Sequence, residues 1–310
     1  MTSLAIIRRA MRRALQWRLL LVSPVVLLVA AAATLIPLSR FLGELFDHST
    51  RWQALGEALD SPALAGLIKA LMTPAAGGLV PALETSVVLA LVFAPLLAGA
   101  ALTVAQTDAR LRIAPLLSGA AEAYPRLLRM QIAAIAPLAI AGFAAAMVFG
   151  WSSHVSDHVT TEAASHTSRR AAWLVSVVAV FLAQLVIDAG RARLVAEPGR
   201  RSAVVALWAG VRLVVKQPGR TLLLSASSTV IALLVATVLL VVRQQLAQSS
   251  TLAVLLAFAV GQLAVVAIAW GHAARLCGLV EIVCDLAPRH PEAVTEAVTE
   301  AATDAPPQAE

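Results

Sequence analysis

Residues 187–220 read IDAGRARLVAEPGRRSAVVALWAGVRLVVKQPGR and separate two long apolar runs. This stretch holds seven of the chain's 24 Lys and Arg residues. Basic residues concentrate in the cytoplasmic loops of membrane proteins. The stretch therefore indicates which side of a membrane this loop occupies, and it orients the rest of the chain.

The chain as a whole is too apolar for a soluble domain of 310 residues, since 59% of it is hydrophobic and only 14% is charged. Its mean hydropathy is +0.82. An apolar run of about 20 residues is long enough to cross the roughly 30 Å hydrocarbon core of a bilayer. We therefore expect an all-α membrane protein with six transmembrane helices, at about 19–38, 85–105, 131–151, 171–187, 221–242 and 252–272.

The distribution of basic residues predicts the topology. If the N-terminus is inside, cytoplasmic segments hold 18 of the 24 Lys and Arg residues and outer segments hold six. This imbalance predicts that both termini are cytoplasmic. Arg outnumbers Lys 22 to 2, which is typical of GC-rich bacterial genes. We expect a bacterial inner-membrane protein whose +6 net charge faces anionic lipid headgroups rather than nucleic acid.

The first apolar run has an alternative interpretation. Residues 3–17 place apolar side chains on one helical stripe among four arginines, which predicts an amphipathic helix on the inner membrane surface. The same residues could begin a signal peptide that is cleaved near residues 30–33. The run at 19–38 is too long for the apolar part of an ordinary signal peptide, so a retained helix is favoured.

An internal repeat is suggested by three Ala-Arg-Leu steps, centred on Arg110, Arg193 and Arg275, which are 83 and 82 residues apart. Each step closes an even-numbered apolar run. Amphipathic segments at about 3–17, 113–128 and 202–216 precede the odd-numbered runs. We therefore predict three units, each with an inner-surface helix and a hairpin of two transmembrane helices. Their approximate bounds are 1–110, 111–193 and 194–287.

Two further segments complete the predicted organisation. Between the first two apolar runs, the sequence of the outer loop predicts a weak helix over 50–59, with Trp52 as an interface anchor. It also predicts a second helix over about 61–72. Residues 288–310 form an acidic, polar four-residue repeat that predicts a disordered cytoplasmic tail. The membrane domain is thus expected to span residues 1–287.

Charged pairs at the cytoplasmic ends of two apolar runs are candidate sites. Asp188 precedes Arg191 by three residues, and Asp108 precedes Arg112 by four. Such pairs could gate a pathway or contact a headgroup or substrate. The favoured interpretation is an exposed ion pair that anchors the helix end and contributes little to stability.

Within the apolar runs, polarity is limited to Gln184, Gln262 and the hydroxyls of residues 225–229. Ion-coupled transporters usually carry ionisable residues at mid-membrane depth, so this composition weighs against that class. We expect the hydroxyls to bond to their own or a neighbouring helix.

His154, His158, Glu162 and His166 are spaced by four residues, so a single helix would align them on one face. That alignment could bind zinc, but a solvated loop is the favoured interpretation, and we expect no metal or cofactor. Cys277 and Cys284 are expected to be buried thiols without a disulfide. No phosphate-binding glycine loop or hydrolase motif is found, so no enzyme activity is predicted.

Several motifs carry a resemblance to a known group: residues 188–197 (DAGRARLVAE), 206–212 (ALWAGVR), 217–220 (QPGR), 94–100 (APLLAGA) and 124–129 (YPRLLR). These resemble uncharacterised bacterial six-span proteins, which are similar to the membrane domain attached to some glycerophosphodiester phosphodiesterases. The resemblance implies an architecture for most of residues 1–287. It does not imply phosphodiesterase activity, because no such domain is present.

Two functions fit these expectations. The first is a non-enzymatic protein that organises membrane lipids or a protein partner through its inner-surface helices. The alternative is a permease-like subunit that moves a lipid-like or apolar solute. A polar lumen lined by Gln184, Gln262 and residues 225–229 would favour transport, whereas tight packing of the helices by Ala and Gly would favour the first function.

Overall fold

The computed structural model describes residues 3–46, 79–107, 111–158, 162–197, 202–246 and 250–286. Over these residues the protein is helical and has no strand, as predicted. The helices are α1 (Ser3–Ala14), α2 (Trp17–Phe46), α5 (Leu79–Gln106), α6 (Ile113–Ala133), α7 (Ile135–His158), α8 (Glu162–Ala196), α9 (Ala203–Lys216), α10 (Pro218–Gln245) and α11 (Thr251–Leu286).

Six helical stretches in the described part are long and apolar enough to cross a membrane. The prediction of a six-span, all-helical membrane protein is thereby confirmed by length and composition. The stretches are Trp17–Gly43, Leu79–Gln106, Ile113–Val155, His166–Ala196, Pro218–Gln245 and Thr251–Leu286.

Large apolar side chains cover the outer surfaces of these helices. On α7, for example, Ile140 is 71% exposed and Phe143 is 69% exposed. Extended apolar surfaces of this kind are unfavourable in water but are well solvated by lipid acyl chains. The surface of the long helices is therefore suited to a bilayer.

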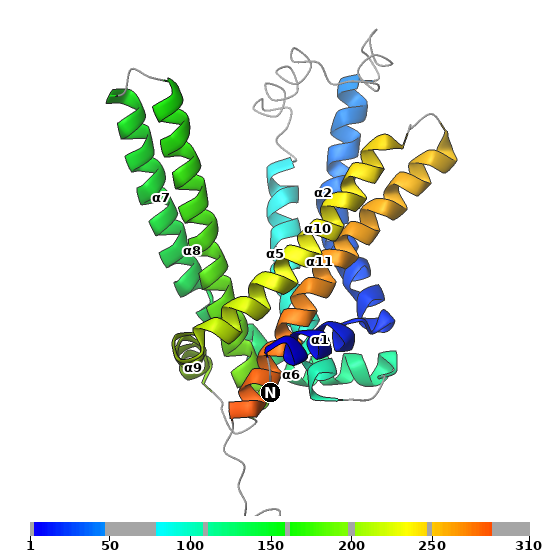
Figure 1. Cartoon of the computed structure of the whole chain (residues 1–310). Helices are drawn as coiled ribbons and strands as arrows, with labels where there is room; N and C mark the ends of the chain where they lie inside the picture. The colour runs from blue at the N-terminus through cyan, green and yellow to red at the C-terminus, as the bar shows by residue number, and fades with distance from the viewer. Residues whose placement is uncertain are drawn as a thin grey trace, which may run out of the picture.

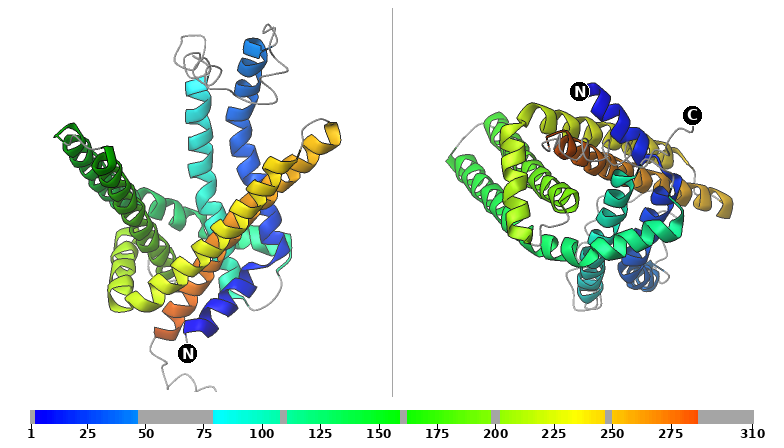
Figure 2. Two further views of the ribbon diagram at one scale, coloured as in Figure 1. Left: turned by 45° about the horizontal axis from the view of Figure 1, so that its top comes forward. Right: turned by 90° about the horizontal axis from the view of Figure 1, so that it is seen from below.

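Consecutive long helices pack side by side in three pairs: α2 with α5, α7 with α8, and α10 with α11 (Figure 1). The three short helices α1, α6 and α9 lie across the lower ends of the long ones. Seen from below in Figure 2, they surround the place where the long helices converge. The upper parts of the pairs spread apart, so the pairs meet mainly at this lower end.

A proline lies at the break between α6 and α7. Pro137 has no N–H, and its ring would clash with the carbonyl of Ala133, where α6 ends. Together they form a 43-residue apolar stretch. An unbroken helix of that length would be about 65 Å long, twice the hydrocarbon core. The break lets α6 lie across the lower end while α7 runs alongside α8.

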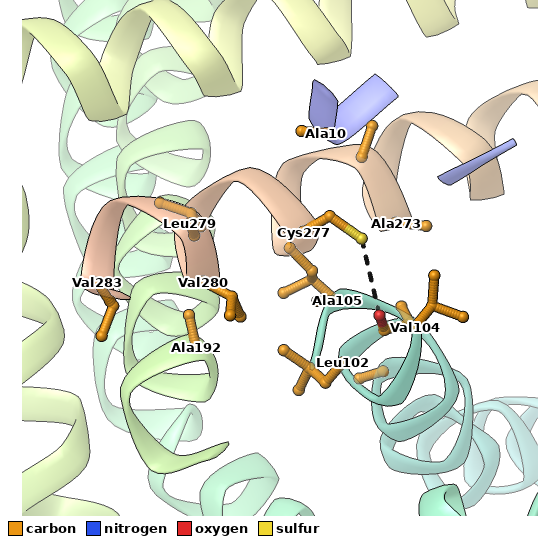
Figure 3. Packing of buried hydrophobic residues seen from close by; sticks show 14 of the residues in the cluster. Ala10, Leu102, Val104, Ala105, Ala192, Ala273, Cys277, Leu279, Val280 and Val283 are labelled. Atoms are coloured by element: carbon orange, nitrogen blue, oxygen red, sulfur yellow. Dashed lines mark hydrogen bonds between the residues drawn. The ribbon is translucent and has the colours of Figure 1, made fainter. Parts of the chain in front are cut away.

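The hydrophobic core lies where the C-terminal ends of α5, α8 and α11 meet the short helices. Leu102, Ala192 and Val280 come together there (Figure 3). Cys277 is buried beside them, and its Sγ donates to the carbonyl oxygen of Ala101 at 3.8 Å. Both cysteines are free, but Cys284 is exposed, so the prediction that it is buried is wrong.

Helices α8 and α9 approach each other closely at two glycines. A Cβ atom on Gly210 would lie only 2.6 Å from the backbone nitrogen of Gly190. No side chain fits in that space, so glycine allows the two backbones to touch. This contact holds α9 against the lower end of α8.

Some predictions concern residues outside the described part of the chain. They are the two outer-loop helices over 50–72 with Trp52, the residues Asp108 and Arg110, and the acidic tail over 288–310. These stay predictions.

Candidate functional site

A buried cluster of charged side chains joins α8 to α11. Asp188 of α8 is completely buried. Its Oδ1 lies 3.0 Å from Nη1 of Arg191, one turn later in the same helix. Its Oδ2 lies 2.7 Å from Nη2 of Arg275 in α11 and 3.8 Å from Nδ1 of His272. One carboxylate is therefore held between two guanidinium groups.

Polar side chains extend this cluster to two more helices. Arg191 donates a short hydrogen bond through Nη2 to Oε1 of Gln131 in α6. Arg275 donates through Nη1 to Oγ1 of Thr229 in α10 at 3.3 Å. The Asp188 cluster, which we define as these side chains with His272, thus connects α6, α8, α10 and α11.

The burial of this cluster corrects a prediction from the sequence. Asp188 and Arg191 do form an ion pair, but Arg191 is only 5% exposed, so the pair is not an exposed one at a helix end. Removing one partner of a buried pair leaves an uncompensated charge and costs about 3–5 kcal/mol. The geometry therefore makes the cluster a structural joint between helices, a role that an exposed pair could not have.

The arginines of the Ala-Arg-Leu steps have different surroundings. Arg275 belongs to the Asp188 cluster, whereas Arg193 pairs with Glu197 at 3.1 Å near the surface of α8. Arg112, from the second predicted ion pair, is exposed directly before α6, and its predicted partner lies outside the described residues. The shared motif thus does not give the two described arginines a shared role.

The single helix that would align three histidines and a glutamate does not occur, and the described part of the segment that was favoured as a solvated loop is helical. His154 and His158 lie in α7, whereas Glu162 and His166 lie in α8. His154 and His166 are both exposed. Among the described residues, no group of three or more His, Cys, Asp or Glu side chains is placed to hold a metal ion.

Of the hydroxyls in residues 225–229, two bond within α10, and that of Ser225 is buried without a hydrogen-bond partner among the described residues. Ser227 and Ser228 donate to carbonyl oxygens three residues earlier, at 3.0 and 3.1 Å. Thr229 accepts the hydrogen bond from the Asp188 cluster. Gln184 and Gln262 are half-buried in α8 and α11. Hydroxyls bonded in this way are the ordinary arrangement in membrane helices.

A second group of charges surrounds a cavity of about 560 Å³ at the elbow between α1 and α2. We call it the elbow cavity. None of its described lining residues is acidic, and four are arginines. The lining residues are Arg9, Arg12, Arg13, Leu15, Gln16, Trp17, Arg18, Thr107 and Leu111.

Contacts with other helices fix part of this lining. Nη1 of Arg13 lies 3.0 Å from Oε1 of Glu281 in α11. Arg18 donates through Nη1 to the carbonyl oxygen of Leu111 at 2.6 Å, and its guanidinium carbon lies 5.2 Å from the centre of the Trp17 ring. These contacts hold the guanidinium groups of Arg13 and Arg18 at the elbow.

An apolar cavity of about 720 Å³ adjoins the elbow cavity on the other side of α1. Arg12 and Leu15 line both cavities. The rest of the second lining is mostly apolar and comes from α1 and α10, including Ile7, Leu223 and Ile231. We call it the α1–α10 cavity.

The sequence predicted a helix with four arginines over residues 3–17, most of which is α1, but it did not indicate either cavity. The elbow cavity is closed by Thr107 and Leu111, about 90 positions away from α1 in the sequence. The α1–α10 cavity depends on residues more than 200 positions away. No local sequence pattern predicts that these distant residues line the same cavity as α1.

Comparisons of the chain with protein-family models, curated proteins and solved structures found no match. The resemblance to the membrane domain attached to some glycerophosphodiester phosphodiesterases therefore stays a prediction from the motifs.

Proposed function

We propose that the chain is a non-enzymatic protein of a bacterial inner membrane that organises lipids or partner proteins at the cytoplasmic face. The observation that carries this proposal is the gathering of α1, α6 and α9 at one end of the six long helices (Figure 1). Short helices with basic and apolar faces at the end of a bundle are suited to contact headgroups and other proteins.

The proposed orientation places this end, with both termini, in the cytoplasm. It is supported by charge, because 18 of the 24 basic residues fall on that side. Five of these arginines are in residues 1–18. An anionic inner leaflet would attract them.

A three-unit architecture is supported by matching contacts of α6 and α9. Gly119 of α6 and Gly210 of α9 each lie ten residues before an arginine at the start of the next long apolar run. A Cβ on either glycine would lie 2.6 Å from an atom of the preceding long helix, Cγ2 of Thr103 or the backbone nitrogen of Gly190. The same kind of crossing thus occurs at corresponding places in two of the proposed units.

Cysteine labelling tests the orientation. In a Cys277→Ala/Cys284→Ala background, His154→Cys and Thr303→Cys provide one reporter on each proposed side. A membrane-impermeant maleimide added to intact spheroplasts should label position 154 and should label position 303 only after permeabilisation. The reverse pattern would contradict the proposed topology.

Co-purification tests the function. The full chain extracted in mild detergent should retain lipids enriched over the bulk membrane, a partner protein, or both, as measured by mass spectrometry. A six-span protein of unrelated sequence, purified in the same way, is the control. Recovery of neither lipid nor protein above that control would refute the proposal.

The packing of α10 against α11 favours this function over the alternative, a permease-like subunit. A Cβ on Gly271 would overlap that of Ala232, and one on Gly278 would meet the side chain of Leu224 at 2.6 Å. Such close contacts leave little room for a solute between α10 and α11. Uptake of lipid-like solutes into reconstituted vesicles would reverse this preference.

A further inference from the structure

A third cavity, of about 320 Å³, lies where α5, α6 and the end of α8 meet, and we call it the α5–α6 cavity. We infer that it binds the headgroup of phosphatidylethanolamine, a phospholipid whose headgroup carries both a phosphate and a primary ammonium. Arg126 contacts the phosphate, and Glu122 contacts the ammonium. This inference rests on the proposed function, because it specifies one class of lipid and the place where it binds.

Two facing sets of residues form most of the described lining of this cavity. Each set follows a spacing of three, four and seven residues from its first member, so it lies on one face of its helix. The sets are Gly99, Leu102, Thr103 and Gln106 of α5, and Gly119, Glu122, Ala123 and Arg126 of α6. The two helix faces therefore enclose the same space.

Contacts among three helices hold this lining in place. A Cβ atom on Gly119 would lie only 2.6 Å from Cγ2 of Thr103, so α6 approaches α5 closely there. Gln106 donates through Nε2 to the carbonyl oxygen of Val195 at 3.2 Å, which joins the end of α5 to the end of α8. The cavity is therefore a fixed feature of the packing between α5, α6 and α8.

Glu122 and Arg126 give the cavity two opposite charges. They are four residues apart in α6, so their Cβ atoms lie about 5–6 Å from each other. No ion pair within the described part of the chain engages either side chain. A guanidinium group donates two parallel hydrogen bonds to phosphate oxygens, and a carboxylate accepts them from an ammonium. Their separation suits the two-carbon spacer between the ammonium and the phosphate of ethanolamine.

The ends of α5 and α8 favour a ligand that carries an ammonium. α5 ends at Gln106 and α8 ends at Ala196, so the C-terminal ends of two helices lie at the cavity. The C-terminus of a helix carries a partial negative charge, which stabilises a cation within its last turn. With Glu122, these helix ends disfavour a purely anionic lipid such as phosphatidylglycerol.

The position of the cavity favours a lipid over a free metabolite. α5 and α8 are two of the helices that can cross a membrane, and their ends lie at the depth of the headgroups. Leu102 and Leu194 are buried and give the cavity an apolar wall. Its volume of about 320 Å³ is near the lower end of the range of about 300–1,000 Å³ for small-molecule pockets. The cavity therefore holds a headgroup while the acyl chains stay in the bilayer.

The test uses native mass spectrometry of the full chain in mild detergent. Four probes are titrated separately: phosphatidylethanolamine, phosphatidylcholine, phosphatidylglycerol and glycerophosphoethanolamine, which is the same headgroup without acyl chains. The wild type should bind phosphatidylethanolamine most tightly of the three lipids. Phosphatidylcholine has no N–H group to donate to Glu122, and phosphatidylglycerol has no ammonium. Equal affinity for the three lipids would overturn the inference.

Glycerophosphoethanolamine separates a lipid from a free headgroup. It should not displace phosphatidylethanolamine at equal concentration, because it has no acyl chains to keep it at the membrane. Displacement would assign the cavity to a soluble ligand and overturn the lipid assignment.

Two single variants test the two charges separately. Arg126→Gln should weaken the binding of phosphatidylethanolamine about tenfold, which is the effect of one hydrogen bond to a charged group. Glu122→Gln should also weaken it but should strengthen the binding of phosphatidylglycerol, because a repulsive charge is removed. A merely structural role of Glu122 would lower the affinity for both lipids, and that result would overturn the assigned contact.

Each charge variant has a matched control. Arg129→Gln removes an exposed arginine from the same helix but outside the described lining, and Glu84→Gln removes an exposed carboxylate near the opposite end of α5. Both should bind phosphatidylethanolamine within about twofold of the wild type, because a distant charge acts almost equally and oppositely on the two groups of this lipid. Equal affinity in Arg126→Gln and Arg129→Gln would place the phosphate elsewhere.

A third comparison fills the cavity without changing charge. Ala123→Leu places a larger side chain in the lining and should lower the affinity for phosphatidylethanolamine. Ala121→Leu is the control, because Ala121 is exposed on the same helix and outside the described lining. Equal affinity in these two variants would contradict binding in the α5–α6 cavity.

The outcomes also separate this inference from the proposed function. A wild-type chain that retains lipid, together with an Arg126→Gln variant that binds phosphatidylethanolamine as the wild type does, overturns only the site. A wild-type chain that retains neither lipid nor protein overturns both.

Discussion

The Asp188 cluster and the elbow cavity both gather arginines at the same end of the molecule, but different groups face those arginines. Arg191 and Arg275 are almost completely buried and meet a fully buried carboxylate. In the elbow cavity, Arg9 and Arg12 are exposed and line an open space without a described acidic residue. The first set of arginines surrounds one buried carboxylate, whereas the second set lies at the surface of the protein.

This difference follows from the cost of removing charge from water. A buried guanidinium group without a partner is strongly destabilising, so Asp188 is needed where Arg191 and Arg275 are packed. An exposed guanidinium group keeps its hydration and can stay without a carboxylate. The number of arginines therefore indicates topology, whereas the group opposite each arginine determines its role.

Asp188→Asn is expected to have the largest effect on stability. The substitution keeps the side-chain shape but leaves two buried guanidinium groups with no carboxylate, so we expect the free energy of unfolding to fall by about 3–5 kcal/mol. An SDS titration in mild detergent would measure it. A loss below 1 kcal/mol, within the range of exposed pairs, would show that the cluster is not a structural joint.

The two described repeat arginines offer a matched comparison. Arg275→Gln removes an ion pair and a hydrogen bond from the buried cluster, and we expect a loss of about 1.5–3 kcal/mol. Arg193→Gln removes a pair with Glu197 near the surface, and we expect less than about 1 kcal/mol. The same SDS titration applies. Equal losses would mean that the contribution of each arginine to the free energy of unfolding depends on the repeat motif and not on burial.

The joint also depends on the backbone contact between α8 and α9. In Gly210→Ala the new Cβ would meet the backbone of Gly190, and we expect a loss of about 1–3 kcal/mol from overpacking. Gly142→Ala in α7 is the control, because nothing lies within 4 Å of its Cβ position. Thermal unfolding followed by circular dichroism should separate the two variants, and a lower Tm for Gly142→Ala than for Gly210→Ala would refute the assigned contact.

The smallest effect on stability is expected in the elbow cavity. Arg9→Gln/Arg12→Gln changes two exposed side chains, so the lipid-free protein should unfold within about 0.5 kcal/mol of the wild type. The same SDS titration would measure this difference. A large loss of stability without lipid would mean that these arginines support the fold, as the buried ones do.

Much of the fold could be predicted because membrane insertion depends on local properties. Length and apolar composition identified the six long helices. The inner segment at about 113–128 corresponds to most of α6, and that at 202–216 corresponds to α9. None of these features requires knowledge of distant contacts.

The candidate sites were predicted less well because they depend on distant residues. Arg191 follows Asp188 by one helical turn and was identified, but the closer partner Arg275 is 87 residues away. A uniform apolar composition gives no indication of which helices converge. The burial of Asp188 could therefore not be foreseen from the sequence.

The possible zinc site required one helix to contain the three histidines and the glutamate. A spacing of four residues aligns side chains only within one helix, and His158 and Glu162 belong to different helices. Two threonines directly precede Glu162 in the sequence, and threonine favours the position before a helix. This helix-start pattern separates His154 and His158 from Glu162 and His166.

The concentration of the core at one end of the long helices has a mechanical consequence. Within the most apolar part of each span, only 11–39% of the residues are buried inside the protein. The remaining surface must be solvated by acyl chains, so the tilt of each helix pair depends on how well its length matches the hydrocarbon thickness. A thinner bilayer would tilt the pairs further about their joined lower ends. The thickness of the bilayer thus influences the angle between the helix pairs, which are joined to one another mainly at their lower ends.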